Sequence, residues 1–187
     1  MFNIQDLMGK ERKGIHVFSK RLNVGEIVNI YGEPYVGKTS SAFYILGQNP
    51  EIPFLYFATE SFDQPYKDAL LKRNKKIYFS KLKDLKAILN SIKMMKINVV
   101  IDSLNGITYE EDNDKILAEV FETVVNFDLN MIVVSQIKNY NREEWYDSKR
   151  ILDFFAYKIK VEKKGDYFDL NKECPIAFKE IWNEAKN

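Results

Sequence analysis

The sequence is poor in the residues on which several common kinds of site depend. It has one cysteine, Cys174, and one histidine, His16. This excludes a disulfide framework and makes a Cys/His zinc site or a Ser-His-Asp triad hard to build. No apolar run approaches the ~18 residues that cross a bilayer, and the first residues lack the apolar core of a signal peptide. We therefore expect a cytoplasmic protein with no membrane partner.

An excess of charge of one sign is also missing. The formal net charge is +1, so the whole chain does not attract nucleic acid and any anion site must be local. The sequence has no repeat, no low-complexity tract and no Pro/Gly/Ser-rich linker. Its 187 residues are 45% hydrophobic, which is enough for one core. These features predict a single domain over residues 1–187.

Short apolar segments alternate with helical patterns along most of the chain. Continuous apolar strands alternating with helices predict an α/β fold with a mostly parallel central sheet and helices on both faces. After residue 150, "FAYKIKVEKK", "DYFDLN" and "CPIAFKEIW" have no helix between them and predict an antiparallel hairpin that extends the sheet edge. The predicted strands are 26–31, 53–59, 76–80, 97–102 and 129–135, and the predicted helices are 38–46, 82–95 and about 114–127.

Glycine is scarce, yet two of the eight glycines belong to one motif. In "NIYGEPYVGKTS", residues 32–39 satisfy G-x-x-x-x-G-K-[ST] between a predicted strand and a predicted helix. In that place, backbone N–H groups and the helix N-terminus bind phosphate, the lysine reaches the β/γ-phosphates and the threonine hydroxyl coordinates Mg²⁺. The motif predicts ATP and Mg²⁺ as cofactors. The predicted nucleotide-binding residues are Gly32, Glu33, Pro34, Tyr35, Val36, Gly37, Lys38, Thr39 and Ser40.

Three polar residues follow predicted strands, where the carboxyl ends of parallel strands meet. Asp102 closes "INVVID" and suits an aspartate that supports Mg²⁺, or else a turn cap made with Ser103 and Asn105. Glu60 follows "FLYFAT" and suits a base for an attacking water, or else an acid in the first turn of a helix. Gln136 follows "MIVVS" and suits a γ-phosphate sensor, although an exposed glutamine at a strand end is an alternative.

Taken in order, four segments resemble the RecA/RadA recombinase family over roughly residues 25–138. They are "GEIVNIYGEPYVGKTS", a strand that ends in Thr-Glu, "VVIDSLNGI" and "IVVSQIKN", and "VEKKGDYFDL" resembles the family's late hairpin. The resemblance implies a RecA-like P-loop fold and a Mg-dependent ATPase. It implies that Lys38 and Thr39 bind phosphates and Mg²⁺ and that Asp102 supports the metal. It also implies that Glu60 activates water and that Gln136 couples the nucleotide state to the following loop.

The sequence also departs from that family. Tyr35 and Val36 stand where the family has small residues in the phosphate loop, which bears on the geometry of the cradle. No phenylalanine begins an F-x-x-A sequence, the motif by which RadA-type subunits join. The resemblance still names a homo-oligomer, a full-length recombinase and another repair protein as candidate partners.

In this family DNA contacts the loops after the last two predicted strands. The first, "NGITYEEDND", is acidic and would repel phosphates. The second, "KNYNREEWYDSKR", interleaves cations with aromatics, which suits single-stranded DNA, although its net charge of +1 suits a solvated loop or helix face equally well. The candidate DNA-binding residues are Lys138, Tyr140, Arg142, Trp145, Lys149 and Arg150.

Two functions from different classes therefore follow. The first is a minimal RecA-family ATPase, similar to the short archaeal RadA paralogues, that acts in DNA recombination or repair. The alternative is a KaiC-like, ATP-responsive module that binds proteins and not DNA, and the acidic first loop favours it. A small-molecule phosphotransferase ranks last, because such an enzyme needs clustered arginines and the five arginines are mostly scattered.

Overall fold

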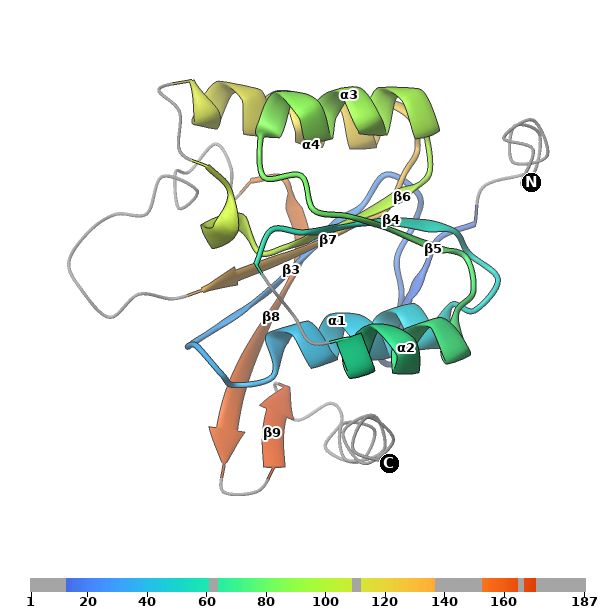
Figure 1. Cartoon of the computed structure of the whole chain (residues 1–187), viewed down its shortest axis with the longest axis vertical. Helices are drawn as coiled ribbons and strands as arrows, with labels where there is room; N and C mark the ends of the chain where they lie inside the picture. The colour runs from blue at the N-terminus through green and yellow to red at the C-terminus, as the bar shows by residue number, and fades with distance from the viewer. Residues whose placement is uncertain (1–12, 61–63, 109–111, 137–152, 165–166, 171–187) are drawn as a thin grey trace.

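A mostly parallel sheet forms the centre of the protein. The computed structural model describes residues 13–60, 64–108, 112–136, 153–164 and 167–170 (Figure 1). Its main sheet has seven strands in the order β5-β4-β6-β7-β3-β8-β9. All neighbours pair in parallel except β9, which is antiparallel to β8. The strands are β3 (Ile27–Gly32), β4 (Phe54–Ala58), β5 (Ile77–Ser80), β6 (Asn98–Asp102), β7 (Met131–Gln136), β8 (Phe155–Lys164) and β9 (Tyr167–Leu170).

Helices cover both faces of this sheet, as the sequence predicts. Figure 1 shows α1 (Lys38–Gln48) and α2 (Gln64–Arg73) on one face and α3 (Leu85–Met95) and α4 (Asn113–Asn126) on the other. The predicted C-terminal hairpin is confirmed as β8 and β9, while the segment that begins at Cys174 lies outside the described residues. Within the described ranges, no helix has both the length and the apolar character needed to cross a membrane.

Two hydrophobic clusters lie on opposite faces of the sheet, and the strands alternate between them. In β6, Val99 and Ile101 belong to the cluster under α3 and α4, whereas Val100 belongs to the cluster under α1 and α2. Because both faces are covered, the central strands are mostly apolar along their whole length. Full burial of one such aliphatic side chain contributes about 1.5–3 kcal/mol, so these strands hold the sheet edge, and the residues at it, in place.

Helix α3 shows why the helical predictions succeed. Leu85, Ile88 and Ile92 recur at steps of three and four residues and are all buried. Asp84 caps the N-terminus, where its carboxylate accepts a hydrogen bond from the Ala87 N–H at 2.7 Å. The prediction began this helix at residue 82, before the cap, because the apolar period alone does not locate the first residue.

Four elements are absent from the sequence prediction. They are α2, the two-stranded sheet of β1 (His16–Val17) and β2 (Lys20–Arg21), and a 3-10 turn, η2 (Leu104–Gly106). Helix α2 is mostly polar and buries little more than Ala69 and Leu70, so its hydrophobic period is weak. Elements this short or this polar are held by hydrogen bonds from the rest of the protein, which periodicity does not reveal.

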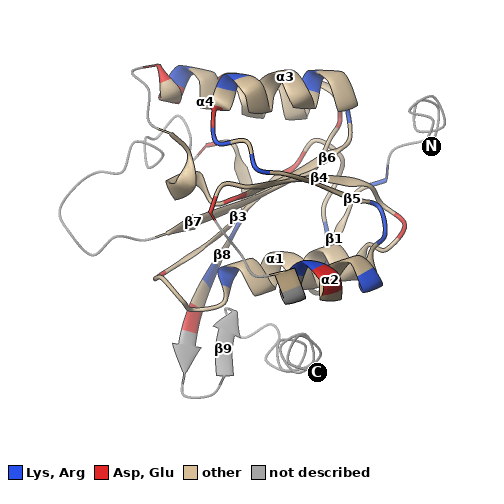
Figure 2. Ribbon diagram, in the orientation of Figure 1, with Lys and Arg blue, Asp and Glu red and all other residues tan. Residues whose placement is uncertain are grey.

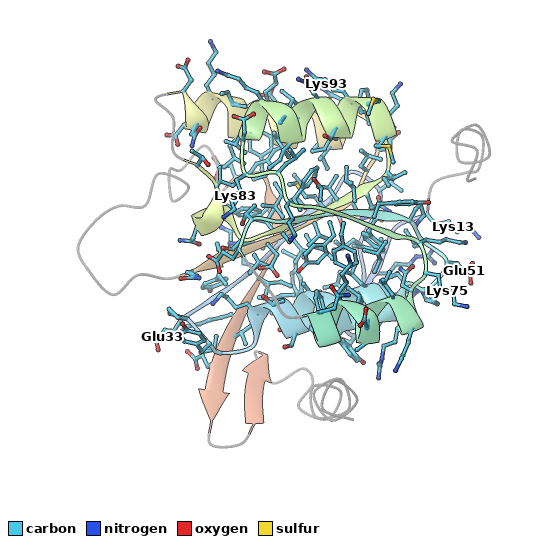
Figure 3. The ribbon with its side chains drawn as sticks, viewed as in Figure 1. Lys13, Glu33, Glu51, Lys75, Lys83 and Lys93 are labelled. Atoms are coloured by element: carbon cyan, nitrogen blue, oxygen red, sulfur yellow. The ribbon has the colours of Figure 1, made fainter. Side chains whose placement is uncertain are left out.

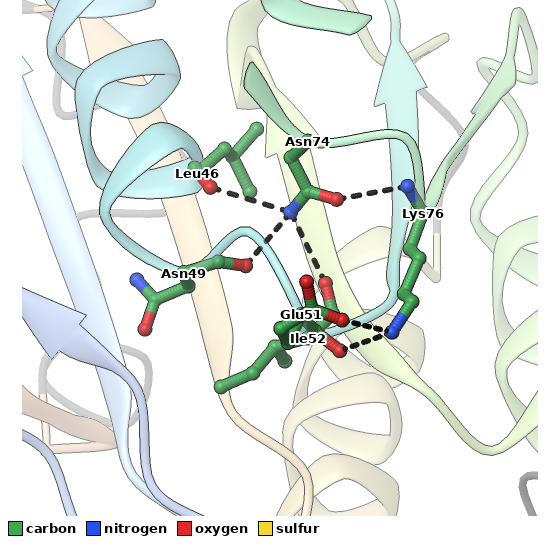
Figure 4. Close-up of polar contacts among 6 residues, drawn as sticks. All are labelled: Leu46, Asn49, Glu51, Ile52, Asn74 and Lys76. Carbon is green, nitrogen blue, oxygen red and sulfur yellow. Dashed lines mark hydrogen bonds and ion pairs between the residues drawn. The ribbon is translucent and has the colours of Figure 1, made fainter. Parts of the chain in front are cut away.

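One buried side chain joins four segments around α1 and α2. The side-chain nitrogen of Asn74 lies 3.3, 2.9 and 3.1 Å from the carbonyl oxygens of Leu46, Asn49 and Ile52 (Figure 4). Its side-chain oxygen accepts a hydrogen bond from the Lys76 N–H at 2.8 Å. Asn74 is 1% exposed, so the ends of α1 and α2 and the start of β5 depend on one amide.

Replacing Asn74 by alanine should destabilise the protein. Removal of the amide leaves buried carbonyl groups without a donor, so we expect the free energy of unfolding to fall by about 2–4 kcal/mol. Urea denaturation followed by circular dichroism measures this change. Asn90→Ala is the matched control, because Asn90 is exposed on α3 and should cost less than about 0.5 kcal/mol. Equal effects of the two substitutions would contradict the assigned role of Asn74.

Candidate active site

The motif loop connects β3 to α1 at the carboxyl edge of the sheet. Gly37, the residue that precedes α1, has φ 94°, a left-handed conformation that suits glycine. None of the described side chains caps α1, and the first turn of this helix contains no acidic residue. The N–H groups of this turn and the positive end of the helix dipole are therefore not neutralised by a cap or a local carboxylate.

Lys38 lies inside the loop. Lys38 is 6% exposed, and its Nζ donates a hydrogen bond to the Glu33 carbonyl oxygen at 2.6 Å. Burial lowers the pKa of Lys38, while the negative charges of Asp102 and Glu60 oppose that shift. The ammonium group therefore faces two carboxylates from neighbouring strands and closes the loop on itself.

The bulky side chains of the loop point away from its inner side. Tyr35 has φ 62° and a side chain that is 97% exposed, so it projects into solvent, as do Glu33 (labelled in Figure 3) and Pro34. Val36 is buried and packs in the cluster under α1. Of the two residues that depart from the family pattern, Tyr35 therefore lies in solvent and Val36 lies in the core.

The pairing of β3 with β8 requires a glycine at position 32. A Cβ atom at Gly32 would lie 2.4 Å from the carbonyl oxygen of Val161 in β8. Real Cβ atoms do not approach so closely, so a side chain here would push β8 away from β3. The first glycine of the motif therefore allows the two strands to pair.

Asp102 ends β6 and is buried, with 7% exposure. The Tyr56 hydroxyl of β4 donates to its Oδ2 at 2.5 Å, and the Thr39 hydroxyl of α1 also hydrogen-bonds to its carboxylate. Burial raises the pKa of Asp102, while Tyr56, Thr39 and Lys38 lower it. Burial likewise raises the pKa of Tyr56 far above its ordinary range, so the phenol remains a donor.

Glu60 follows β4 and contacts two side chains. The Ser103 hydroxyl donates to its Oε1 at 2.9 Å, and the Gln136 Nε2 donates to the same oxygen at 3.3 Å. Glu60 lies outside α2, which begins at Gln64 and has no acid in its first turn. The predicted base and the predicted sensor are therefore in contact, and the helix-acid alternative for Glu60 does not describe its position.

Hydrogen bonds between the Thr59 side chain and the Ser103 backbone hold the ends of β4 and β6 together. Thr59 Oγ1 accepts from the Ser103 N–H at 2.7 Å and donates to the Ser103 carbonyl at 2.5 Å. A Cβ atom at Gly106 would lie 2.4 Å from Thr59 Oγ1, so only glycine lets η2 lie against this strand end. The Asn105 side chain accepts from the Gln136 N–H at 2.7 Å, which attaches β7 to the same turn.

The structure thus brings together Lys38, Thr39, Glu60, Asp102 and Gln136, five residues selected from sequence. Asp102 does not cap the following turn, because its carboxylate bonds to Tyr56 and Thr39, and Ser103 makes no side-chain cap there. Four contributing residues were not selected as site residues. Ser103 and Asn105 follow Asp102 in sequence, which is a signal for both. Tyr56 lies in β4 and Thr59 directly follows it, in an apolar segment whose sequence indicates only core. The four residues of the site that were not selected from the sequence are therefore Tyr56, Thr59, Ser103 and Asn105.

The site offers oxygen ligands for a divalent cation. In the described part of the chain, no three His, Cys, Asp or Glu side chains group as a metal site. The Thr39 hydroxyl and the Asp102 carboxylate lie side by side. Mg²⁺ takes few protein ligands and completes its shell with water and phosphate oxygens, so this pair fits Mg²⁺. The candidate DNA-binding residues at 138–150 lie outside the described residues.

No protein-family model matches the chain, and no curated protein matches it.

Replacing Asp102 by asparagine should change how stability depends on pH. The folded-state pKa of Asp102 is raised, so the ionised carboxylate costs stability at neutral pH. As the pH falls through that raised value, the folded state takes up a proton that the unfolded state does not yet bind. Without Mg²⁺ or nucleotide, the stability of the parent relative to Asp102→Asn should therefore increase as the pH falls from 7 toward about 4.

Denaturant unfolding at a series of pH values measures this difference. Asp114→Asn is the control, because Asp114 is an exposed acid in the first turn of α4. The stability of the Asp114→Asn variant relative to the parent should change much less over the same pH range. A parent-to-Asp102→Asn difference that stays constant with pH would contradict the assigned burial cost.

Proposed function

We propose that the protein is a RecA/RadA-like ATPase core that acts in DNA recombination or repair, as a minimal recombinase paralogue or an accessory to a full recombinase. One observation carries the proposal. A lysine from the motif loop faces the carboxylates of Asp102 and Glu60, which end two neighbouring strands. An isolated turn between a strand and a helix does not require this convergence, whereas phosphoryl transfer to water does.

In this proposal the loop and α1 bind the phosphates. The N–H groups at the start of α1 donate to phosphate oxygens, and Lys38 exchanges the Glu33 carbonyl for the β/γ-phosphates. Thr39 and Asp102 would hold Mg²⁺, which supplies positive charge against the phosphates when bound. Tyr56 fixes the orientation of the Asp102 carboxylate through its hydroxyl.

Glu60 orients and deprotonates the attacking water. Ser103 and Gln136 both donate to its Oε1, so, among the described residues, Oε2 has no hydrogen-bond donor. That oxygen is the one to accept a proton from water. Gln136 touches the base directly and its own N–H is bound by Asn105. A change at Glu60 is therefore transmitted to the end of β7 and to the loop that follows it.

One observation favours the second function. Asp112 and Asp114 are exposed at the start of α4, on the segment after β6 that the family uses to contact DNA. Carboxylates at that place repel a phosphate backbone. A KaiC-like module that binds ATP and a protein partner needs no DNA contact and fits this charge.

The steady-state rate of ATP hydrolysis, measured with and without single-stranded DNA, tests the proposal. The parent should hydrolyse ATP, and Glu60→Gln should still bind ATP but turn over about 10²-fold or more slowly. Single-stranded DNA should stimulate the parent, and the stimulation should fade as salt is added.

Glu119→Gln is the matched control, because Glu119 is an exposed glutamate on α4. Full turnover by Glu60→Gln would remove Glu60 from the mechanism. ATP binding without stimulation by DNA would select the protein-binding module, and a phosphoryl acceptor other than water would select a phosphotransferase.

A further inference from the structure

Positive charge is concentrated in one part of a nearly neutral chain. Residues 64–96 contain ten basic residues and two aspartates, a net charge of +8, whereas the whole chain carries +1. This stretch forms α2, β5 and α3. Although the net charge of the chain is close to zero, the region around the β5 edge of the sheet is therefore strongly basic.

Four of these lysines are exposed, and their side chains make no ion pair or hydrogen bond with described residues. In contrast, Lys76 pairs with Glu51 at 2.6 Å, and Lys93 on α3 pairs with Glu119 at 2.8 Å. We call the exposed set the basic edge. It consists of Lys72, Lys75, Lys81 and Lys83.

The basic edge follows the outermost strand of the sheet. β5 is at the end of the strand order and, among the described strands, pairs only with β4. Figure 3 labels Lys75 and Lys83 near its two ends, and Figure 2 shows blue segments at both. Four strand residues span about 13 Å. Lys67 on α2 lies over the Phe79 ring of β5 at 5.0 Å, which places α2, and with it the Lys72 segment, beside the strand.

We propose that the basic edge binds the sugar-phosphate backbone of a nucleic acid, without sequence preference. Lysines spaced along a line match a chain of regularly spaced phosphates. They are point charges without the planar fork that reads guanine. An acidic protein partner would need an apolar centre to its interface, and a membrane would need an exposed apolar face. Leu82, 36% exposed, is the only large apolar side chain exposed on the described part of this edge.

Protection of an edge strand against aggregation is the other known use of lysine at such a place. Protective charges lie within the strand, where they oppose pairing with a further strand. β5 has the sequence IYFS and contains no charge, and its lysines lie before and after it. The arrangement therefore extends charge along the edge without blocking the strand itself.

The basic edge is separate from the nucleotide site but connected to it through the backbone. The Thr108 N–H donates to the Lys83 carbonyl at 3.0 Å, which joins the segment after β5 to the segment that follows η2. None of the four lysines belongs to the motif loop or contacts Glu60. Nucleic-acid binding at this edge therefore goes beyond the proposed ATPase function and does not require nucleotide.

Fluorescence anisotropy without ATP tests the proposal. The probes are labelled single-stranded DNA, duplex DNA and RNA of one length, which separate the possible sources of the phosphate backbone. The variant Lys75→Gln/Lys81→Gln/Lys83→Gln should bind its best probe about 100-fold more weakly at 0.1 M salt than the parent does. The slope of log K against log salt should become shallower by about 2–3, close to 0.7–0.9 for each lost phosphate contact.

The control variant is Lys93→Gln/Lys115→Gln/Lys158→Gln, which removes the same charge from exposed positions outside the basic edge. Equal slopes for the two variants would overturn the proposal, as would the absence of binding by the parent to all three probes at low salt. Competition by polyglutamate as effective as unlabelled DNA at equal charge would also overturn it and indicate an acidic protein partner. Mg-ATP binding by both variants, measured separately, tells a failure of this proposal from a failure of the nucleotide site.

Discussion

Parallel pairing of β4, β6, β7 and β3 is the constraint on which the site depends. The register pairs Ala58 with Asp102 and Gly32 with Gln136. Each strand end therefore delivers its polar residue to the same edge of the sheet. The apolar runs that bury these strands on both faces determine that register, because a slip by one residue would exchange the two faces. Core packing and side-chain placement at the site are in this way consequences of the same strands.

Formation of the site lowers the stability of the fold. Asp102 and Lys38 are both buried. Burial raises the pKa of Asp102 and lowers the pKa of Lys38, and in each case this favours the neutral form. Their mutual attraction and the hydroxyl groups of Tyr56 and Thr39 offset this cost only in part. Charged groups buried without a structural need indicate a functional site more strongly than surface charges do. The lysines of the basic edge differ from these buried groups. They are exposed to water and act through their number and spacing.

Much of the fold follows from local pattern, and part of the site follows from position along the chain. Continuous apolar runs predicted the five central strands to within about two residues, and polar residues placed after them predicted Glu60, Asp102 and Gln136. Tyr56 could not be predicted, since a tyrosine in a buried strand reads as core until its hydroxyl is seen to meet Asp102. Helix α2 was missed because one buried amide, Asn74, anchors its end in place of a wide apolar face. The charge of the basic edge could have been counted from the sequence, but its alignment along the outer strand depends on the sheet order.

Calorimetric titration of Mg-ATP into the parent and into Lys38→Ala, with Lys115→Ala as the control on an exposed lysine, tests whether the loop between β3 and α1 binds a nucleotide. We expect one nucleotide bound per parent chain and no change for the control. Binding to Lys38→Ala should be at least about tenfold weaker, because a charge-assisted contact to phosphate is lost. Equal affinities for the parent and Lys38→Ala, or a parent that does not bind Mg-ATP, would contradict nucleotide binding by this loop.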